Sequence, residues 1–193
     1  MEENENSRRT ERRRRAPTLT LLNGAPGSGK STLAALLAEE RPLALALDID
    51  AVKHALGGWD EDLTRSGLQA RRLATAMIGQ HLADGRDVVL GQYLARIPFL
   101  DELEQLAAAR EARFVEVALL LDEHTLAQRL QRRRERPDRP EQARNDRFVS
   151  PGQAGELIRS IEEVLALRPA ARRVDASGSI EQTLAAVRAL LAR

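Results

Sequence analysis

Residues 24–32 of the chain are Gly24-Ala25-Pro26-Gly27-Ser28-Gly29-Lys30-Ser31-Thr32, and they are the most informative segment for the fold. It matches G-x-x-x-x-G-K-[ST], the pattern of a phosphate-binding loop, or P-loop, whose glycines let backbone N–H groups surround phosphate oxygens. In this pattern Lys30 reaches the β- and γ-phosphates, and the Ser31 hydroxyl ligates Mg²⁺. We therefore expect residues 24–32 to bind ATP together with Mg²⁺.

The residues on both sides of this loop give it the required context, which a merely glycine-rich turn would lack. Apolar patterns predict strands near residues 18–23, 43–47, 87–90, 114–120 and 172–174. Three- and four-residue spacing predicts helices near residues 30–40, 63–83, 99–110, 124–134, 151–167 and 180–192. Alternating strands and helices indicate a parallel sheet covered on both faces. The predicted fold class is α/β, a P-loop NTPase three-layer sandwich with a five-stranded parallel sheet, flanking helices and a lid.

The length of 193 residues fits one such domain, which we place at residues 17–193. Residues 1–16 are polar and arginine-rich, and we expect a disordered basic tail there. The tail is either a contact for nucleic acid or an acidic partner, or a solvated terminus. Residues 132–150 are rich in Arg, Pro, Asp and Glu and show no periodicity, so we predict a mobile lid.

Composition excludes several classes of protein. The formal charge is +1, which provides no overall field for nucleic acid, and the absence of cysteine excludes disulfides and thiolate metal sites. Apolar runs are too short to cross a membrane, and no secretory signal is present, so we expect a cytoplasmic protein. Of the 30 basic residues only Lys30 and Lys53 are lysines, which makes each a more informative residue than any single arginine.

Two aspartates follow the second predicted strand, in the run Leu47-Asp48-Ile49-Asp50. Residues two apart on an extended chain project to the same side, so both carboxylates can face the crevice where open α/β sheets bind ligands. One carboxylate can orient an acceptor hydroxyl, and the other can ligate Mg²⁺. Alternatively, Asp48 or Asp50 caps the following helix.

From residue 19 to residue 192 the chain resembles the small P-loop kinases typified by chloramphenicol phosphotransferase, zeta toxin and the polynucleotide 5′-hydroxyl kinase domain, a group of AAA-type ATP-binding proteins. The resemblance implies that Asp50 is the catalytic base. It also implies that Lys53, three positions later, contacts the substrate or the γ-phosphate; the alternative is a solvated helix residue. The loop around Ser177 and Ser179 resembles the one that borders adenine in these kinases, although both serines also suit plain helix caps.

The same resemblance implies roles for three arginines. The segment 122–133 resembles the entry to the lid of adenylate-kinase-like enzymes, which implies that Arg129 stacks on adenine and that Arg133 reaches phosphates. Arg129 and Arg133 share a helical face at this spacing, and a guanidinium suits both tasks. Arg147 precedes a helix that begins near Pro151, as a lid arginine does in the polynucleotide kinases, which implies that Arg147 is a catalytic lid residue that helps to neutralise the charge developing on the phosphates. Each of these arginines has a simple surface role as its alternative.

The third strand departs from the family pattern, because it ends in Val89-Leu90-Gly91-Gln92-Tyr93 without a carboxylate. We therefore expect Ser31, Asp48 and water to coordinate the metal ion. Gln92 is a candidate to position a water or a substrate hydroxyl. Tyr93 and Trp59 are candidates to stack on the acceptor, and packing is the alternative for each.

We expect phosphorylation of a hydroxyl on a small molecule such as an antibiotic, a nucleoside or a sugar, and the acidic run Asp60-Glu61-Asp62 favours a neutral or cationic one. A polynucleotide 5′-hydroxyl kinase is the first alternative, supported by the arginine-rich tail. A regulatory or assembly ATPase is the second, because the run from Leu119 to Glu123 reads like a Walker B strand with Glu123 as its acid. The sequence decides neither the acceptor nor the oligomeric state.

Overall fold

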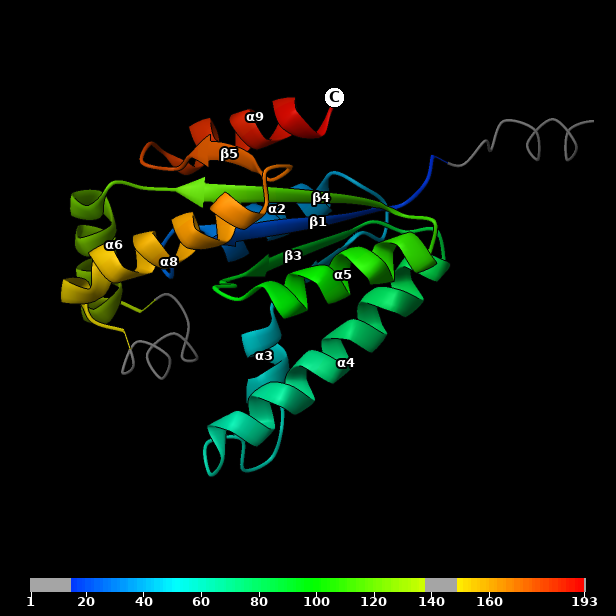
Figure 1. The fold of residues 1–193 in the computed structure, drawn as a ribbon, viewed down its shortest axis with the longest axis horizontal. Coiled ribbons are helices and arrows are strands. Elements are labelled where there is room, and N and C mark those ends of the chain that lie inside the picture. The colour runs from blue at the N-terminus through cyan, green and yellow to red at the C-terminus, as the bar shows by residue number, and fades with distance from the viewer. Residues whose placement is uncertain (1–14, 138–148, 193) are drawn as a thin grey trace, which may run out of the picture.

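The computed structural model describes residues 15–137 and 149–192. Its sheet has five parallel strands in the order β2-β3-β1-β4-β5, which confirms the predicted fold (Figure 1). The strands are β1 (Thr18–Gly24), β2 (Leu45–Leu47), β3 (Val88–Gln92), β4 (Arg113–Leu120) and β5 (Arg172–Asp175). Within these ranges no helix is long and apolar enough to cross a membrane.

Seven α-helices and one 3₁₀ helix are described within the same residues. They are α2 (Lys30–Glu39), α3 (Ile49–His54), α4 (Leu63–Ala83), α5 (Ile97–Ala109), α6 (Glu123–Glu135), η2 (Pro151–Gln153), α8 (Ala154–Leu167) and α9 (Ile180–Leu191). Helix α3, which follows β2 directly, was not among the predicted helices. The last-but-one helix was predicted to start at residue 151, where the chain instead forms η2 before α8.

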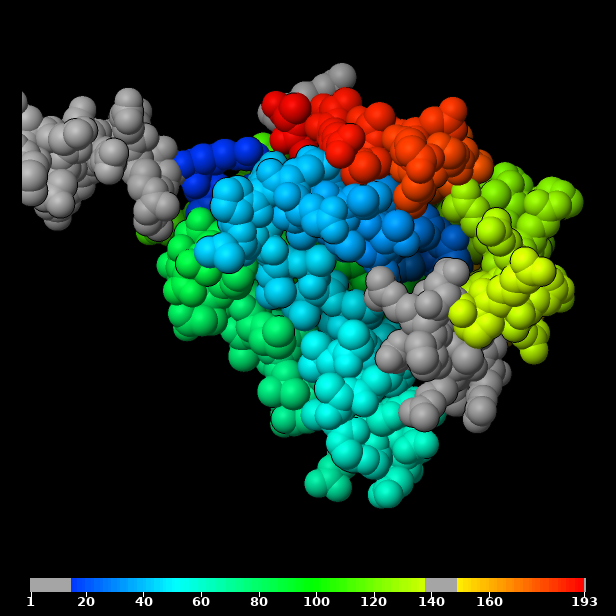
Figure 2. Space-filling model, turned by 180° about the vertical axis from the view of Figure 1, so that it is seen from behind, coloured from blue at the N-terminus to red at the C-terminus, as the bar shows by residue number. Residues whose placement is uncertain are grey.

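Helices cover both faces of the sheet because side chains alternate along the central strand. Leu22 of β1 packs in one core cluster with Leu33 of α2 and Val187 of α9. Leu19 and Leu21 of β1 pack in another cluster with residues of α4 and α5, including Ile78 and Leu103. Figure 2 views the first face, with α2 in blue beside α9 in red. The three layers follow from this division.

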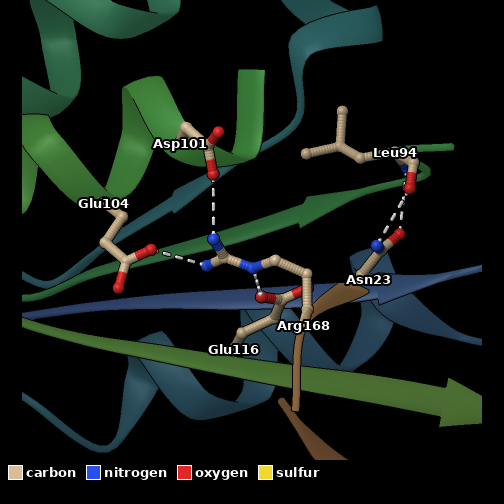
Figure 3. Close-up of polar contacts among 6 residues, drawn as sticks. All are labelled: Asn23, Leu94, Asp101, Glu104, Glu116 and Arg168. Carbon is tan, nitrogen blue, oxygen red and sulfur yellow. Dashed lines mark hydrogen bonds and ion pairs between the residues drawn. The ribbon is translucent and has the colours of Figure 1, made fainter. Parts of the chain in front are cut away.

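A charged network ties β4 to the helices on the second face (Figure 3). Arg168, which follows α8, donates to Glu116 of β4 at 3.0 Å and pairs with Asp101 and Glu104 of α5 at 3.0 and 2.8 Å. The Glu116 side chain is only 3% exposed. Burial raises the pKa of Glu116, and its hydrogen bond and ion pair with Arg168 oppose that rise. The guanidinium therefore stabilises a carboxylate that would otherwise be costly inside the protein.

The predicted tail and lid lie mostly outside the described residues. Residues 1–14 are outside, so the basic tail stays a prediction. The proposed lid begins inside α6, because residues 132–135 continue that helix, and residues 138–148 are outside. Arg147 belongs to this second range, and its role also stays a prediction.

Candidate active site

The phosphate loop joins β1 to α2 at the carboxyl edge of the sheet. Gly29 precedes α2 with a φ of 91°, a left-handed conformation that glycine adopts without strain. A Cβ on Gly29 would also stand 3.1 Å from Cδ1 of Ile180. Ser28 is buried, and its N–H donates to the Ala25 carbonyl at 3.1 Å. The loop thus turns tightly, and the N-terminus of α2 opens toward the space where phosphates would bind.

Lys30 is the buried cation of this loop. Its Nζ donates to the Ala25 carbonyl at 2.8 Å and to Ser28 Oγ at 3.5 Å. Burial lowers the pKa of Lys30 to about 7, and the nearby Arg133 guanidinium adds to this shift, while Asp48 and Asp50 oppose it. Within residues 15–137 and 149–192 no carboxylate forms an ion pair with this ammonium, so a phosphate group is a ligand whose charge it matches.

A cavity of about 610 Å³ lies over the loop. Its walls come from the phosphate loop, from α6 and from the segment that leads into α9. They are lined by Gly27, Ser28, Gly29, Lys30, Ser31, Thr32, Arg129, Arg132, Arg133, Arg136, Gly178, Ser179, Ile180 and Thr183. Of the residues predicted for nucleotide binding, Gly24, Ala25 and Pro26 do not line it; Gly24 ends β1, and Ala25 and Pro26 follow it.

Helix α6 gives the cavity a basic wall. Asp122 caps this helix, accepting from the Thr125 N–H at 2.8 Å, and Figure 1 shows α6 beyond the arrowhead of β4. The four cavity arginines recur at three- and four-residue spacing, at positions 129, 132 and 133 of α6 and at its C-cap, 136. Only Arg129 and Arg133 were predicted from the sequence, although the same four-residue spacing also relates Arg132 to Arg136.

Arg129 is fixed to the loop that precedes α9. Its Nη2 donates to the Ser177 carbonyl at 3.2 Å and to the Gly178 carbonyl at 2.8 Å. Ser179 caps α9 through a hydrogen bond from the Gln182 N–H at 3.3 Å. Two parts of the cavity wall that are far apart in sequence therefore form one unit, with a planar guanidinium between them.

The carboxylates after β2 lie at the other side of the phosphate loop. Asp48 Oδ2 accepts from the Ser31 hydroxyl at 2.9 Å, and Asp48 Oδ1 accepts from the Asp50 N–H at 2.9 Å. Asp48 is therefore the N-cap of α3 and at the same time a neighbour of Ser31. Gln92 joins this group, because its Oε1 accepts from the Ile49 N–H at 3.3 Å. The structure brings Ser31, Asp48, Asp50 and Gln92 together.

The end of β3 approaches the start of α2 closely. A Cβ on Gly91 would stand 3.1 Å from the carbonyl oxygen of Lys30, so a larger residue would displace the phosphate loop. Gln92, the next residue, then contributes an amide where the family pattern has an acid. This packing gives a physical reason for a glycine at the third-strand edge.

Asn23 is a buried side chain at this edge that the sequence analysis missed. Its Oδ1 accepts from the N–H groups of Gly24 and Leu94, each at 2.9 Å, and its Nδ2 donates to the Leu94 carbonyl at 3.0 Å (Figure 3). These bonds continue the pairing of β1 with β3 past Gln92, where the register ends. A polar residue between the apolar part of β1 and the phosphate loop was the available signal.

The two aromatic candidates differ in their surroundings. Tyr93 points to α8, where its hydroxyl is 2.8 Å from Ser160 Oγ. Trp59 is 8% exposed and packs on His54 and Lys53 of α3. Lys53 in turn pairs with Asp50 at 3.3 Å. Trp59 therefore lies beside the Asp50 group, whereas Tyr93 faces another element.

The acid of the Walker B-like run, Glu123, lies against α8 and does not line the cavity over the phosphate loop. A Cβ on Gly155 of α8 would stand 3.0 Å from the Glu123 carboxylate. Glu123 begins α6, and the preceding Asp122 is used as its cap. The structure therefore gives no support to Glu123 as an acid at the phosphates.

Comparisons with known proteins agree with this geometry. A family model described as an AAA domain matches residues 19–150. A search of curated proteins finds no significant match. Among solved structures, the chain is similar to a gluconokinase from Sinorhizobium meliloti 1021, with 22% identity, a TM-score of 0.62, and coverage of 93% of this chain and 94% of that one.

Two further structures share the fold. A tunicamycin resistance protein from Deinococcus radiodurans has 14% identity and a TM-score of 0.60, with coverage of 91% of this chain and 96% of that one. A chain of the Pnkp1/Rnl/Hen1 RNA repair complex has 18% identity and a TM-score of 0.61, with coverage of 80% of this chain and 48% of that one. The protein therefore belongs to the AAA domain family that this model describes, and its fold is that of the P-loop kinases.

Proposed function

We propose that this chain transfers the γ-phosphoryl group of ATP to a hydroxyl group of a small molecule, with Mg²⁺ bound. The observation that carries the proposal is the double hydrogen bond of Asp48. By accepting from Ser31 at 2.9 Å and from the Asp50 N–H at 2.9 Å, Asp48 fixes the candidate base relative to the phosphate loop. A phosphoryl-transfer site needs this fixed relation between the nucleophile and the phosphates.

The residues at the loop fit Mg²⁺. The ion prefers oxygen ligands and binds through one or two carboxylates together with phosphate oxygens. Ser31 and Asp48 offer a hydroxyl and a carboxylate oxygen 2.9 Å apart. When bound, the ion would neutralise charge on the β- and γ-phosphates. Ser31 and Asp48 are therefore the two side chains that we assign to it.

In the proposed reaction Asp50 accepts the proton of the acceptor hydroxyl as that oxygen attacks the γ-phosphorus. The bond between the γ-phosphorus and the β,γ-bridging oxygen breaks, and ADP leaves with the electron pair. Lys30 and Arg133 counter the charge that develops on the phosphate oxygens, an electrostatic contribution typical of phosphoryl transfer. Asp50 is 43% exposed, so an acceptor can reach its carboxylate.

The nucleotide would occupy the cavity over the loop. Its triphosphate would lie along the loop toward Lys30, and its base would lie near Arg129 and the Gly178 carbonyl. The planar guanidinium of Arg129 suits stacking on a base, and its two hydrogen bonds hold it in place. The arginines at positions 132, 133 and 136 surround the negative charge of the phosphates.

The similar structures suggest acceptors to test. The gluconokinase and the tunicamycin resistance protein indicate small molecules by their names, and the RNA repair complex indicates a polynucleotide. The acidic run at residues 60–62 favours a neutral or cationic small molecule, whereas the arginines of residues 8–15 favour a nucleic acid. A screen with γ-labelled ATP should therefore include gluconate, other sugars, nucleosides, tunicamycin and a 5′-hydroxyl oligonucleotide.

We expect label in one of the small molecules and none in the same reaction with Lys30→Met. Label in the oligonucleotide alone would replace the small-molecule acceptor with a polynucleotide end. Release of inorganic phosphate without label in any acceptor, together with its loss in Glu123→Gln, would instead establish the ATPase alternative and overturn the proposal.

A further inference from the structure

Trp59 is a buried side chain in an exposed loop. The loop connects α3 to α4, and its residues Gly57, Gly58 and Asp60 are exposed, whereas Trp59 is 8% exposed. The Trp59 ring packs on His54, with ring centroids 4.3 Å apart and an interplanar angle of 57°. This contact returns the loop to the last turn of α3, the helix that begins beside Asp48.

The same ring meets the Lys53 ammonium. Nζ of Lys53 lies 5.4 Å from the centroid of Trp59 and 3.3 Å from Asp50 Oδ1. A cation at this distance from an indole is attracted to it, and the attraction grows when water is excluded. The Lys53 side chain is 16% exposed, so much of its water is removed. Lys53 is thus held between an aromatic ring and a carboxylate.

A lysine side chain has a long, flexible stem and no preferred direction for its charge. A Lys–Asp pair three residues apart on a helix is a weak interaction when one partner is partly exposed, and the Asp50 side chain is 43% exposed. The pair between Lys53 and Asp50 therefore needs another contact to persist. The Trp59 ring supplies this contact.

We propose that Trp59 is a positioning residue, which holds the Lys53 ammonium against Asp50 and thereby orients the carboxylate toward the acceptor. Lys53 occupies Oδ1 of Asp50. Oδ2 of Asp50 makes no hydrogen bond within residues 15–137 and 149–192, and this oxygen is the one that would take the hydroxyl proton. This inference rests on the proposed role of Asp50 as the base.

The chain offers a direct test, because Lys30 and Lys53 are its only lysines. Full-length protein labelled with ¹³C at the lysine ε-carbons should give two NMR signals, and Lys53→Arg identifies the Lys53 signal. The ring current of Trp59 should shift the Lys53 ε-protons upfield. Trp59→Leu should move them to the position of a free lysine, and Trp59→Phe should keep part of the shift.

Phe99 provides a matched control. It is also 8% exposed, and its ring lies 5.3 Å from the Arg71 guanidinium, so Phe99→Leu removes a comparable aromatic contact from α5. We expect Phe99→Leu to leave the Lys53 signal unchanged. The Lys30 signal and its response to ATP report whether each variant is folded. A Lys53 signal that stays in place in folded Trp59→Leu or Trp59→Phe would overturn the proposal.

Kinetics with an identified acceptor provide the second readout. We expect Trp59→Leu to lower kcat by about tenfold or more while the KM for ATP stays within about twofold, because only the orientation of the base changes. Trp59→Phe should recover most of kcat, and Phe99→Leu should match the wild type. An unchanged kcat in Trp59→Leu would contradict the inference. If the wild type phosphorylates no acceptor, the proposed function fails, while the NMR comparison still decides where Lys53 lies.

Discussion

The Ser31 hydroxyl donates to Asp48 Oδ2 at 2.9 Å, and this bond joins the first turn of α2 to the end of β2. In the proposed site these two oxygens would hold Mg²⁺ when the nucleotide is bound. We therefore expect Ser31→Ala to weaken ATP binding in Mg²⁺ on the order of 10–100-fold, the usual effect of disturbing a metal site. Isothermal titration calorimetry should show no such loss in EDTA. Equal weakening with and without Mg²⁺ would show that Ser31 acts on the loop rather than on the metal.

We expect Lys30 to take up a proton when the nucleotide binds. Burial lowers the pKa of Lys30 to about 7, so at pH 8 the Lys30 side chain is neutral in most molecules of the free protein. Phosphates stabilise the ammonium and raise this pKa, so binding at pH 8 takes up a proton, whereas at pH 6 Lys30 is already charged. Affinity should accordingly fall as the pH rises above 7. Calorimetry in buffers of different ionisation enthalpy measures the uptake.

Lys30→Met is the control for this proton. The variant removes the titrating group and should abolish the uptake at pH 8. If Lys30→Met takes up as many protons on ATP binding as the wild type, another group binds the proton and the assignment to Lys30 is wrong.

Arg129 should contribute more to ATP binding than Arg134, an arginine of the same helix that does not line the cavity. Arg129→Ala removes hydrogen bonds to the Ser177 and Gly178 carbonyls and loosens the cavity wall. Hydrogen bonds from a charged group are worth about 1.5–3 kcal/mol, so we expect the Kd for ATP to rise about tenfold or more. Arg134→Ala, at an exposed position of the same helix outside the cavity, serves as the matched variant. Equal Kd values for the two variants would refute the assignment.

The Arg168 network predicts a specific loss of stability. Arg168→Met leaves Glu116 buried without its main partner, which should lower the free energy of unfolding by about 3–5 kcal/mol. Arg173→Met breaks the exposed pair of Arg173 with Glu162 and should cost less than about 1 kcal/mol. Urea denaturation compares them. Adding Glu116→Met to Arg168→Met should restore most of the loss, and similar values for all three variants would contradict this account.

The fold could be predicted from the sequence because the residues of the phosphate loop follow a strict spacing. The segment before the loop also has the apolar pattern of a strand, and the segment after it has the pattern of an amphipathic helix. The alternation of later strands and helices then required a parallel sheet. Helix α3 was missed because it has only six residues and follows β2 after a single residue, so it lacks a readable period. Capping of the following helix was nevertheless one of the roles predicted for Asp48, which is the N-cap of α3.

The site was predictable where one local motif defines it and less so where distant segments meet. Ser31, Asp48 and Asp50 lie in two short runs, and the sheet brings these runs together. The bond from Arg129 to Gly178 spans 49 residues, and the bonds of Asn23 to Leu94 span 71. Nothing local in the sequence encodes such partners. The packing of Trp59 on Lys53 is likewise a product of the α3–α4 connection.

The most direct test of the proposed kinase is Asp50→Asn. The amide has nearly the same shape but cannot accept the hydroxyl proton, so the variant should bind Mg²⁺ and ATP with the wild-type Kd. Transfer of the γ-phosphoryl group to the identified acceptor should fall about 10²–10⁴-fold, the usual contribution of a general base. Transfer at the wild-type rate by Asp50→Asn would contradict the assignment of the base and the mechanism built on it.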